Sequence, residues 1–328
     1  MAGVQDSRLA VAVSNAGGLG SLPGAMFGLD AMRKELAHLA AHTTRPYNVN
    51  FFCHTPPRVN AERETEWRAV LAPYYRECQL DVEDVPTGVS RAPFSAETAG
   101  LLEDFKPAVV SFHFGLPSAE LLARVRAAGS KIFSSATTVD EARWLEAHGV
   151  DAIIAQGFEA GGHRGMFLSA DLSTQVGTFA LLPQIVQAVA LPVVAAGGIA
   201  DANGVRAAMA LGAACVQVGT AYLLCPEATT SALHRAALKS GAAQLTAVTN
   251  VFTGRPARSI VNRIVRELGP INPAAPAFPL ASVAVAALRA SAERLGRDDF
   301  SSLWAGQNTM GCREAPAAIL TRELASLD

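Results

Sequence analysis

Four side chains that can do acid–base or ion chemistry stand close together in one glycine-rich stretch of the sequence. They are an amide, a carboxylate, an imidazole and a guanidinium, at Gln156, Glu159, His163 and Arg164. The glycines are residues 157, 161, 162 and 165. Glycine lets a backbone turn sharply and approach a ligand closely. The stretch therefore favours a ligand-binding loop over a flexible surface loop, because a similar pattern of strand followed by glycine occurs twice downstream.

The glycine-rich stretch follows a short apolar run, residues 151–155, which is typical of a β-strand. Such runs alternate with helical stretches of ten or more residues, as in parallel βα units. The runs that we interpret as parallel strands are 19–22, 47–52, 109–114, 131–135, 151–155, 193–196 and 214–218. A closed barrel of such units has eight strands. We therefore predict an α/β fold, a TIM (β/α)8 barrel that lacks its first strand in this chain, and we expect that strand upstream of Met1.

The regular alternation stops near residue 220. Four later stretches have helical patterns, and a stretch at 270–279 carries four prolines, which indicates a loop or linker. The helical stretches are 227–240, 256–268, 280–296 and 314–326. We therefore expect a barrel domain over residues 1–225 and a helical cap over residues 226–328 that packs on the barrel.

In a parallel barrel, ligands bind at the carboxyl ends of the strands. The polar residues and glycines at those ends are Asn50, His113, Gln156, Gly197-Gly198 and the run from Gln217 to Thr220. The carboxamides of Asn50 and Gln156 present a donor and an acceptor together, which suits the edge of a flavin ring. His113 is as consistent with a structural role as with a substrate contact. No lysine lies at a strand end, which disfavours a Schiff-base aldolase.

Gly197 and Gly198 stand between a predicted strand and a helix that begins near Ala202. Backbone N–H groups at such a turn, together with the helix N-terminus, favour a bound phosphate. Gly219 and Thr220 follow the next strand and would supply the second half of this cradle. Phosphate sites after the last two strands recur in this fold. The alternative is that these glycines only make tight turns between strand and helix.

Composition disfavours several classes of function. The net charge is −2 and 17% of the residues are charged, so no nucleic-acid footprint is expected. Five cysteines are scattered without a C-x-x-C pair, which argues against zinc and disulfides and fits a reducing cytoplasm. The carboxylates form no tight cluster, so we expect no metal site. No run of 18 apolar residues occurs, and we expect no membrane span and find no signal peptide.

The stretch from Ala155 to Gly165, AQGFEAGGHRG, is similar to the signature of class I nitronate monooxygenases, formerly called 2-nitropropane dioxygenases. Further blocks across nearly the whole chain resemble that family. They are residues 1–3 with 9–20 (LAVAVSNAGGLG), 111–115 (SFHFG), 196–199 (AGGI), 217–220 (QVGT), 252–256 (FTGRP) and 304–307 (WAGQ). The family has a further strand before the methionine.

The resemblance implies a TIM barrel that holds FMN non-covalently, and it implies that His163 is catalytic. The residues that it places at FMN are Met1, Asn50, Gln156, Gly161, Gly198, Gln217, Val218, Gly219 and Thr220. We add Gly197 through the phosphate cradle, and we expect His113 and Arg164 at the substrate.

The function that the resemblance implies is FMN-dependent oxidation of alkyl nitronates, such as propionate 3-nitronate, with O2 to a carbonyl product and nitrite. His163 would either hydrogen-bond the anionic nitro group or remove a proton from a neutral nitroalkane. One alternative is reduction of a quinone or an enoyl thioester with NAD(P)H. Another is a phosphate-ligand barrel or a flavin-binding protein without turnover. As partners we expect the small-molecule nitronate and O2, no nucleic acid and no membrane, in a cytoplasmic monomer or homodimer.

Overall fold

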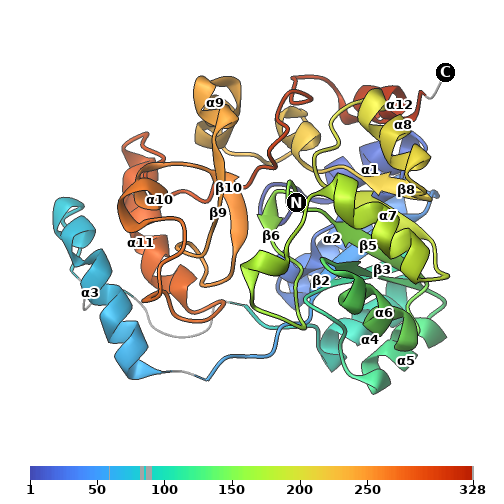
Figure 1. Ribbon diagram of the computed structural model, residues 1–328, viewed down its shortest axis with the longest axis horizontal. Helices are drawn as coiled ribbons and strands as arrows, with labels where there is room; N and C mark the ends of the chain where they lie inside the picture. The colour runs from blue at the N-terminus through green and yellow to red at the C-terminus, as the bar shows by residue number, and fades with distance from the viewer. Residues whose placement is uncertain (59, 82–84, 86–90, 327–328) are drawn as a thin grey trace.

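A computed structural model describes residues 1–58, 60–81, 85 and 91–326 of the protein. Figure 1 shows two parts side by side. On the right, helices surround a curled sheet and follow the chain from blue to yellow. On the left, a smaller part collects one blue helix and the orange segments that come much later in the sequence.

The larger part is built on a seven-stranded parallel sheet in the order β1-β2-β3-β4-β5-β7-β8. The strands are β1 (Gly20–Leu22), β2 (Tyr47–Phe52), β3 (Val109–His113), β4 (Lys131–Ala136), β5 (Ala152–Gln156), β7 (Val193–Ala196) and β8 (Cys215–Gln217). All seven predicted strands are confirmed. The order makes each strand the neighbour of the next, which is the topology of a TIM-barrel-like α/β fold.

Helices connect these strands and lie around the sheet (Figure 1). They are α1 (Ser7–Asn15), α2 (Leu29–His42), α4 (Ala96–Phe105), α5 (Ala119–Ala127), α6 (Val139–Ala147), α7 (Thr178–Ala188) and α8 (Ala202–Ala210). The expected start of α8 is confirmed, because the Asp201 carboxylate accepts from Gly204 N at 2.8 Å. Such a cap satisfies an N–H group that a helix start leaves without a partner. Across the described ranges, no helix has both the length and the apolarity that a membrane crossing requires.

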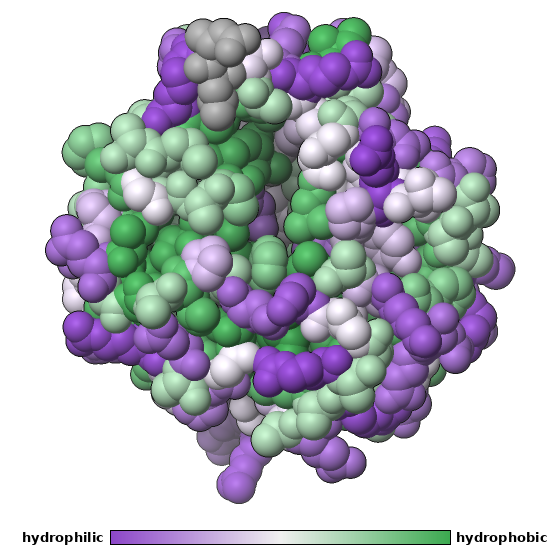
Figure 2. All heavy atoms as spheres, turned by 90° about the vertical axis from the view of Figure 1, so that its right-hand side faces the viewer, coloured by the Kyte–Doolittle hydropathy of each residue, from purple (hydrophilic) through white to green (hydrophobic). Residues whose placement is uncertain are grey.

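The parallel sheet is open between β1 and β8 within the described chain. The seven strands of the predicted barrel are therefore present as an open sheet, and the position of an eighth strand stays a prediction. Cys215 and Gln217 of β8 are exposed at this edge. Figure 2 looks at the side of the molecule on which β8 lies and shows a hollow near its centre, bordered in part by apolar side chains.

A small antiparallel sheet stands between the two parts. β6 (Gly162–His163) pairs with β10 (Ala257–Ile260), and β10 pairs on its other side with β9 (Thr246–Thr249). The prediction of a helix over 256–268 is therefore wrong in its first half, since α10 covers only Arg263–Leu268. The four residues of β10 are all buried; all four pair with β9, and the first two also pair with β6. Tertiary pairing thus overrides the local helical pattern.

The remaining helices are α9 (Ala232–Lys239), α11 (Ala281–Arg294) and α12 (Ala317–Ala325), as predicted but shorter. The boundary that we expect at residue 225 stays a prediction. One helix from each side of residue 225 packs against helices from the other side. α12 packs against α1 and α8 of the larger part. Conversely, α3 (Ala61–Glu77) leaves the larger part and packs against α11 (Figure 1).

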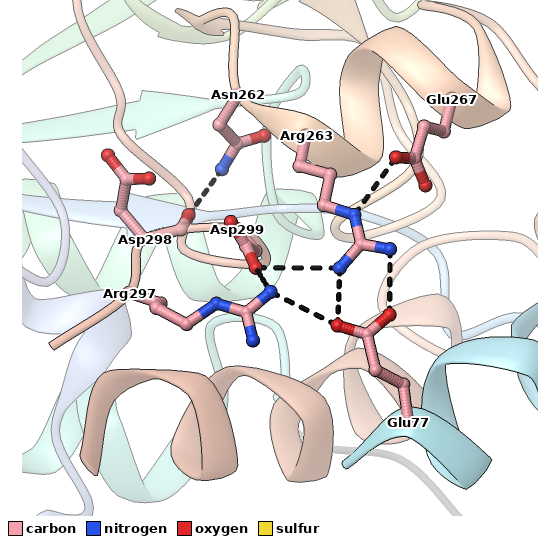
Figure 3. A network of polar contacts seen from close by, with 7 residues as sticks. All are labelled: Glu77, Asn262, Arg263, Glu267, Arg297, Asp298 and Asp299. Carbon is pink, nitrogen blue, oxygen red and sulfur yellow. Dashed lines mark hydrogen bonds and ion pairs between the residues drawn. The ribbon is translucent and has the colours of Figure 1, made fainter. Parts of the chain in front are cut away.

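An ion network fastens α3 to the smaller part (Figure 3). Arg263 of α10 donates to both carboxylate oxygens of Glu77, each at 2.7 Å, and donates to Glu267 at 2.9 Å. Arg297 donates to Glu77 at 3.1 Å and also pairs with Asp299. We call these five residues the α3 clamp. It joins three segments that are far apart in the sequence.

Candidate active site

The glycine-rich stretch runs from the end of β5 to β6, where His163 pairs with Ala257 of β10. The pairing takes the imidazole out of an open loop, and His163 is only 8% exposed. Its Nε2 lies 2.9 Å from Thr253 Oγ1. The imidazole that we expect to be catalytic is therefore held on a strand with one ring nitrogen bonded.

Gln156 braces the stretch from inside. Its Oε1 accepts from Gly165 N at 2.7 Å, and its Nε2 donates to the His163 carbonyl at 2.9 Å. Both ends of the carboxamide thus bind the backbone on either side of Arg164. The side chain expected at a flavin edge fixes the loop instead, and its contact with FMN stays a prediction.

His113 lies directly behind the same loop. Its Nε2 lies 3.1 Å from the His163 carbonyl, and its Nδ1 lies 2.9 Å from Ser135 Oγ. Because a carbonyl only accepts, the neutral ring carries its proton on Nε2 and accepts from the serine at Nδ1. A Cβ at Gly165 would come within 2.9 Å of His113 Cε1, so only glycine fits there. Of the two roles considered for His113, these contacts support the structural one.

Arg164 points into the protein. It is fully buried, and its guanidinium donates to the carbonyls of Gln156 at 2.8 Å and Gly157 at 2.7 Å. Its Nε donates to Gln175 Oε1 at 3.1 Å. The structure therefore places Arg164 as a brace of the loop, and its expected contact with the substrate stays a prediction.

Aromatic rings surround His163. The ring centroids of Phe278 and Trp304 lie 5.2 and 5.3 Å from that of His163, and those of Phe114 and Phe52 lie 6.0 and 6.1 Å away. Phe114 has a φ of +72°, which L-residues rarely adopt. Such a conformation persists only where surrounding contacts hold it. The result is an apolar wall that limits water at the imidazole.

The wall also sets the charge of the imidazoles. Burial is the main cause that lowers the pKa of His113 to about 3. Burial, helped by the nearby charges of Arg91 and Arg255, lowers the pKa of His163 well below its ordinary value. Both rings are therefore neutral at neutral pH, so each can donate at one nitrogen and accept at the other.

The predicted phosphate cradle has free donors. Gly197 and Gly198 have φ values of +122° and +73°, a conformation that favours glycine. Within the described residues, the N–H groups of Gly198, Gly219 and Thr220 donate to no other protein atom. These groups follow β7 and β8, which are neighbours in the sheet. They can bind an anion together.

Other residues predicted at the cofactor line the same edge. Met1 Cγ would lie 3.5 Å from a Cβ built at Gly219, which brings the first residue to the end of β8. Asn50 is half-buried and donates to Ser111 Oγ at 2.9 Å. Gln217 is exposed, and Val218 is half-buried. Gly161, by contrast, is packed against Gly306, where a Cβ would come within 2.5 Å of the backbone nitrogen.

Sequence reasoning missed several residues that build the site. Glu141 is buried and accepts from the backbone of Thr137 at 2.7 Å and of Leu168 at 3.2 Å, which ties the loop to α6. Thr253 and Arg255 belong to the FTGRP block. The resemblance of this block to the family marked the two residues but did not indicate what they do. Glu141 carried no signal of its own, because a single carboxylate on a helix is normally solvated.

These features are those of an enzyme of the parallel α/β barrel class, and the candidate site lies at the carboxyl ends of the strands. A family model described as nitronate monooxygenase matches residues 1–326. A nitronate monooxygenase from Paraburkholderia phytofirmans is 43% identical over 99% of this chain and 89% of its own. The chain therefore belongs to the nitronate monooxygenase family, which is a family of oxidoreductases.

Solved structures agree with this assignment. A nitroalkane oxidase from Streptomyces ansochromogenes superposes with a TM-score of 0.89 at 39% identity, over 99% of this chain and 93% of its own. FabK from Thermotoga maritima superposes with a TM-score of 0.70 at 25% identity, over 100% of this chain and 90% of its own. The fold is thus shared with a chain of only 25% sequence identity.

Proposed function

We propose that the protein oxidises alkyl nitronates, such as propionate 3-nitronate, with FMN and O2, and releases a carbonyl product and nitrite. The observation that carries the proposal is the neutral imidazole of His163, bonded at Nε2 and enclosed by the apolar wall, on the segment that follows the end of β5. The free N–H cradle follows β7 and β8 of the same sheet. Family membership supports nitronates as the substrate class. The cofactor and the particular nitronate are our inference.

The residues of the chain fit FMN. The N–H groups of Gly198, Gly219 and Thr220 would hold its phosphate, and Asn50 and Met1 would lie along the ring system. Asn50 uses its Nδ2 on Ser111, and its Oδ1 accepts no hydrogen bond from the described residues, so the oxygen can accept from a ring N–H. When bound, FMN would supply the redox chemistry, taking electrons from the nitronate and passing them to O2.

His163 would act on the nitro group. The Thr253 hydroxyl can donate to Nε2 or accept from it, because a hydroxyl does both. If it donates, Nδ1 carries the ring proton and can hydrogen-bond the anionic nitro group. If it accepts, Nδ1 is a free base that can take a proton from a neutral nitroalkane. A nitronate has already lost that proton, so its oxidation requires only the first role.

The test starts with the absorbance spectrum of the purified protein, in which we expect a flavin. Oxygen uptake and nitrite release on addition of a pre-formed nitronate should follow. Because the pKa of His163 is lowered, kcat/KM for the nitronate should show no imidazole inflection between about pH 6 and 8. A colourless protein that does not bind added FMN, or a flavoprotein without nitrite release, would refute the proposal.

The reductase alternative predicts a different result. Anaerobic mixing with NADH should leave the flavin oxidised if nitronate oxidation is the function. Rapid bleaching by NADH together with slow nitronate turnover would favour reduction of a quinone or an enoyl thioester instead.

A further inference from the structure

Arg255 is a half-buried cation beside the imidazoles, and the described residues only partly satisfy it. Its Cζ lies 3.9 Å from the centroid of the Phe114 ring. One terminal nitrogen donates to the carbonyl of Met166. Its Nε, however, is buried without a partner. None of the ion pairs found in the described part of the chain includes Arg255.

A neighbouring arginine on β10 provides the contrast. Arg258 also stacks on an aromatic ring, with its Cζ 4.8 Å from the Phe158 centroid. Its Nε and Nη2 donate to the Phe158 carbonyl at 3.0 and 2.8 Å, and its Nη1 donates to Thr246 at 3.1 Å. Arg258 is thus a structural arginine whose nitrogens are all used, whereas Arg255 retains donor capacity.

Arg255 lies close to the reacting end of the site. Phe114, on which it stacks, contacts the His163 ring edge-on. Thr253 Oγ1, the partner of His163 Nε2, also lies 3.4 Å from the Arg255 carbonyl, to which it can donate when it accepts from the imidazole. The charge of Arg255 contributes to lowering the pKa of both His113 and His163. Burial lowers the pKa of Arg255 itself to about 10, so it stays protonated at neutral pH.

We propose that Arg255 is a specificity-determining residue that binds a carboxylate at the far end of the substrate, so that the protein prefers nitronates carrying a second negative charge. The inference rests on the proposed function. A guanidinium fork matches a carboxylate in shape and charge. The charge of Glu141 raises the pKa of Arg255 but forms no ion pair with it, so a bound carboxylate would add the direct partner that this half-buried guanidinium lacks among the described residues. His163 and Arg255 both pack on Phe114, so a short carbon chain can join the two anionic ends.

The test compares two substrates in one variant. Arg255→Met removes the charge and keeps an apolar side chain on Phe114. We expect kcat/KM for propionate 3-nitronate to fall roughly 10- to 100-fold, the range for a hydrogen bond to a charged group. For propyl-1-nitronate, which lacks the carboxylate, we expect a change of less than about threefold. Equal losses on both substrates, or no loss on either, would overturn the proposal.

Arg258→Met is the matched control, because it removes a second stacked arginine, three residues further along the chain. It should lower stability without discriminating between the two nitronates. If Arg255→Met does not fold, Arg255→Gln serves as the second variant with the same expected discrimination. Arg258→Met discriminating as strongly as the Arg255 variant would also overturn the proposal.

A binding measurement separates this inference from the proposed function. Isothermal titration of the wild-type holoprotein with propionate should give saturable heat, and titration with 1-propanol should give none. Arg255→Met should lose the propionate signal. If propionate binds through Arg255 but no nitronate is turned over, the proposed function fails and the carboxylate site stands. If propionate does not bind the wild-type protein, the carboxylate site fails, whatever the activity.

Discussion

Arg164 and Arg263 each donate three hydrogen bonds from one guanidinium, but in opposite environments. Arg164 is fully buried and donates to two main-chain carbonyls and one amide. The Arg263 side chain is 28% exposed and donates to the carboxylates of Glu77 and Glu267. Exposed charge pairs are screened by water and salt, whereas buried acceptors have no substitute partner. The loop of the candidate site is therefore held by buried hydrogen bonds to uncharged acceptors, and the α3 clamp is held by ion pairs.

The pKa values differ in the same way. Burial, helped by the nearby charge of Arg258, lowers the pKa of Arg164 to about 10, although the carboxylates of Glu159 and Glu141 oppose the shift. The carboxylates around Arg263 raise its pKa above the ordinary value. Arg263 also holds the pKa of Glu77 at about 2, with help from Arg297. The α3 clamp thus stabilises the charged forms of Arg263 and Glu77. In the loop, burial disfavours the charge of Arg164, but its guanidinium supplies the hydrogen bonds that the loop carbonyls need.

The largest expected effect is on catalysis, and it comes from substituting His163 in the loop that Arg164 braces. His163→Asn keeps a polar side chain but cannot titrate. We expect kcat/KM for a pre-formed nitronate to fall about 10²–10³-fold, the usual cost of losing one contact to a reacting anion. Turnover of a neutral nitroalkane should fall further if His163 is also its base. Flavin content, measured by absorbance, should stay unchanged.

Equal losses on the nitronate and on the nitroalkane would assign His163 to anion binding alone. Wild-type rates on both would remove His163 from the reaction and direct attention to His113.

The second prediction compares the stability lost on removing Arg164 with that lost on removing Arg263. Arg164→Met leaves the buried Gln156 carbonyl and Gln175 Oε1 without the donor that Arg164 supplies, whereas the Gly157 carbonyl keeps Ala160 N. We expect a loss of about 2–4 kcal/mol in the free energy of unfolding. Arg263→Met removes the same number of hydrogen bonds from the clamp and should lower it by no more than about 1 kcal/mol. Urea denaturation of both variants measures the difference. Similar losses would show that exposure does not decide the strength of these contacts.

The third prediction concerns how the stability of the protein changes at acidic pH. The pKa of His113 is lowered to about 3, so the unfolded chain binds protons first, and stability should fall as pH drops from about 6.5 toward 3. The contribution of Glu77 is present above about pH 4.5 and is lost toward pH 2. His113→Gln should therefore reduce the slope between pH 6.5 and 4.5 by up to about 1.4 kcal/mol per pH unit. Denaturation at stepped pH values measures it, and an unchanged slope would contradict a buried neutral His113.

The smallest expected effect is the loss of stability on removing the Glu77 carboxylate from the α3 clamp. Glu77→Gln removes a carboxylate that is 38% exposed, and we expect at most about 1 kcal/mol of destabilisation at low salt. In 1 M NaCl, where the Debye length is about 3 Å, the wild type and the variant should differ less. Arg164→Met, as the reference, should show the same loss at both salt concentrations.

Most of the seven strands were predictable because they are short apolar runs that end near glycine or a polar residue, and parallel strands are usually buried on both faces. His163, Gly197 and Gly198 could be found for the same reason, since a strand end positions whatever follows it. The role of Arg164 could not, because the sequence does not show which way a side chain leaves a loop. β10 and Arg255 depend on pairing with segments about 90 residues away, as in the His163–Thr253 contact. Local patterns do not contain that information.

The excursion of α3 fixes an order of events during synthesis. Trp67, Leu71 and Tyr75 are buried against segments near the other end of the chain, and the Tyr75 hydroxyl bonds to the carbonyl of Ala284, 209 residues later. At roughly 5–20 residues per second, a ribosome needs about 10–40 s to make that partner. During this interval the helix carries an apolar face without its final cover. The nascent chain should therefore present a chaperone-binding segment at residues 61–77 until its last third has emerged.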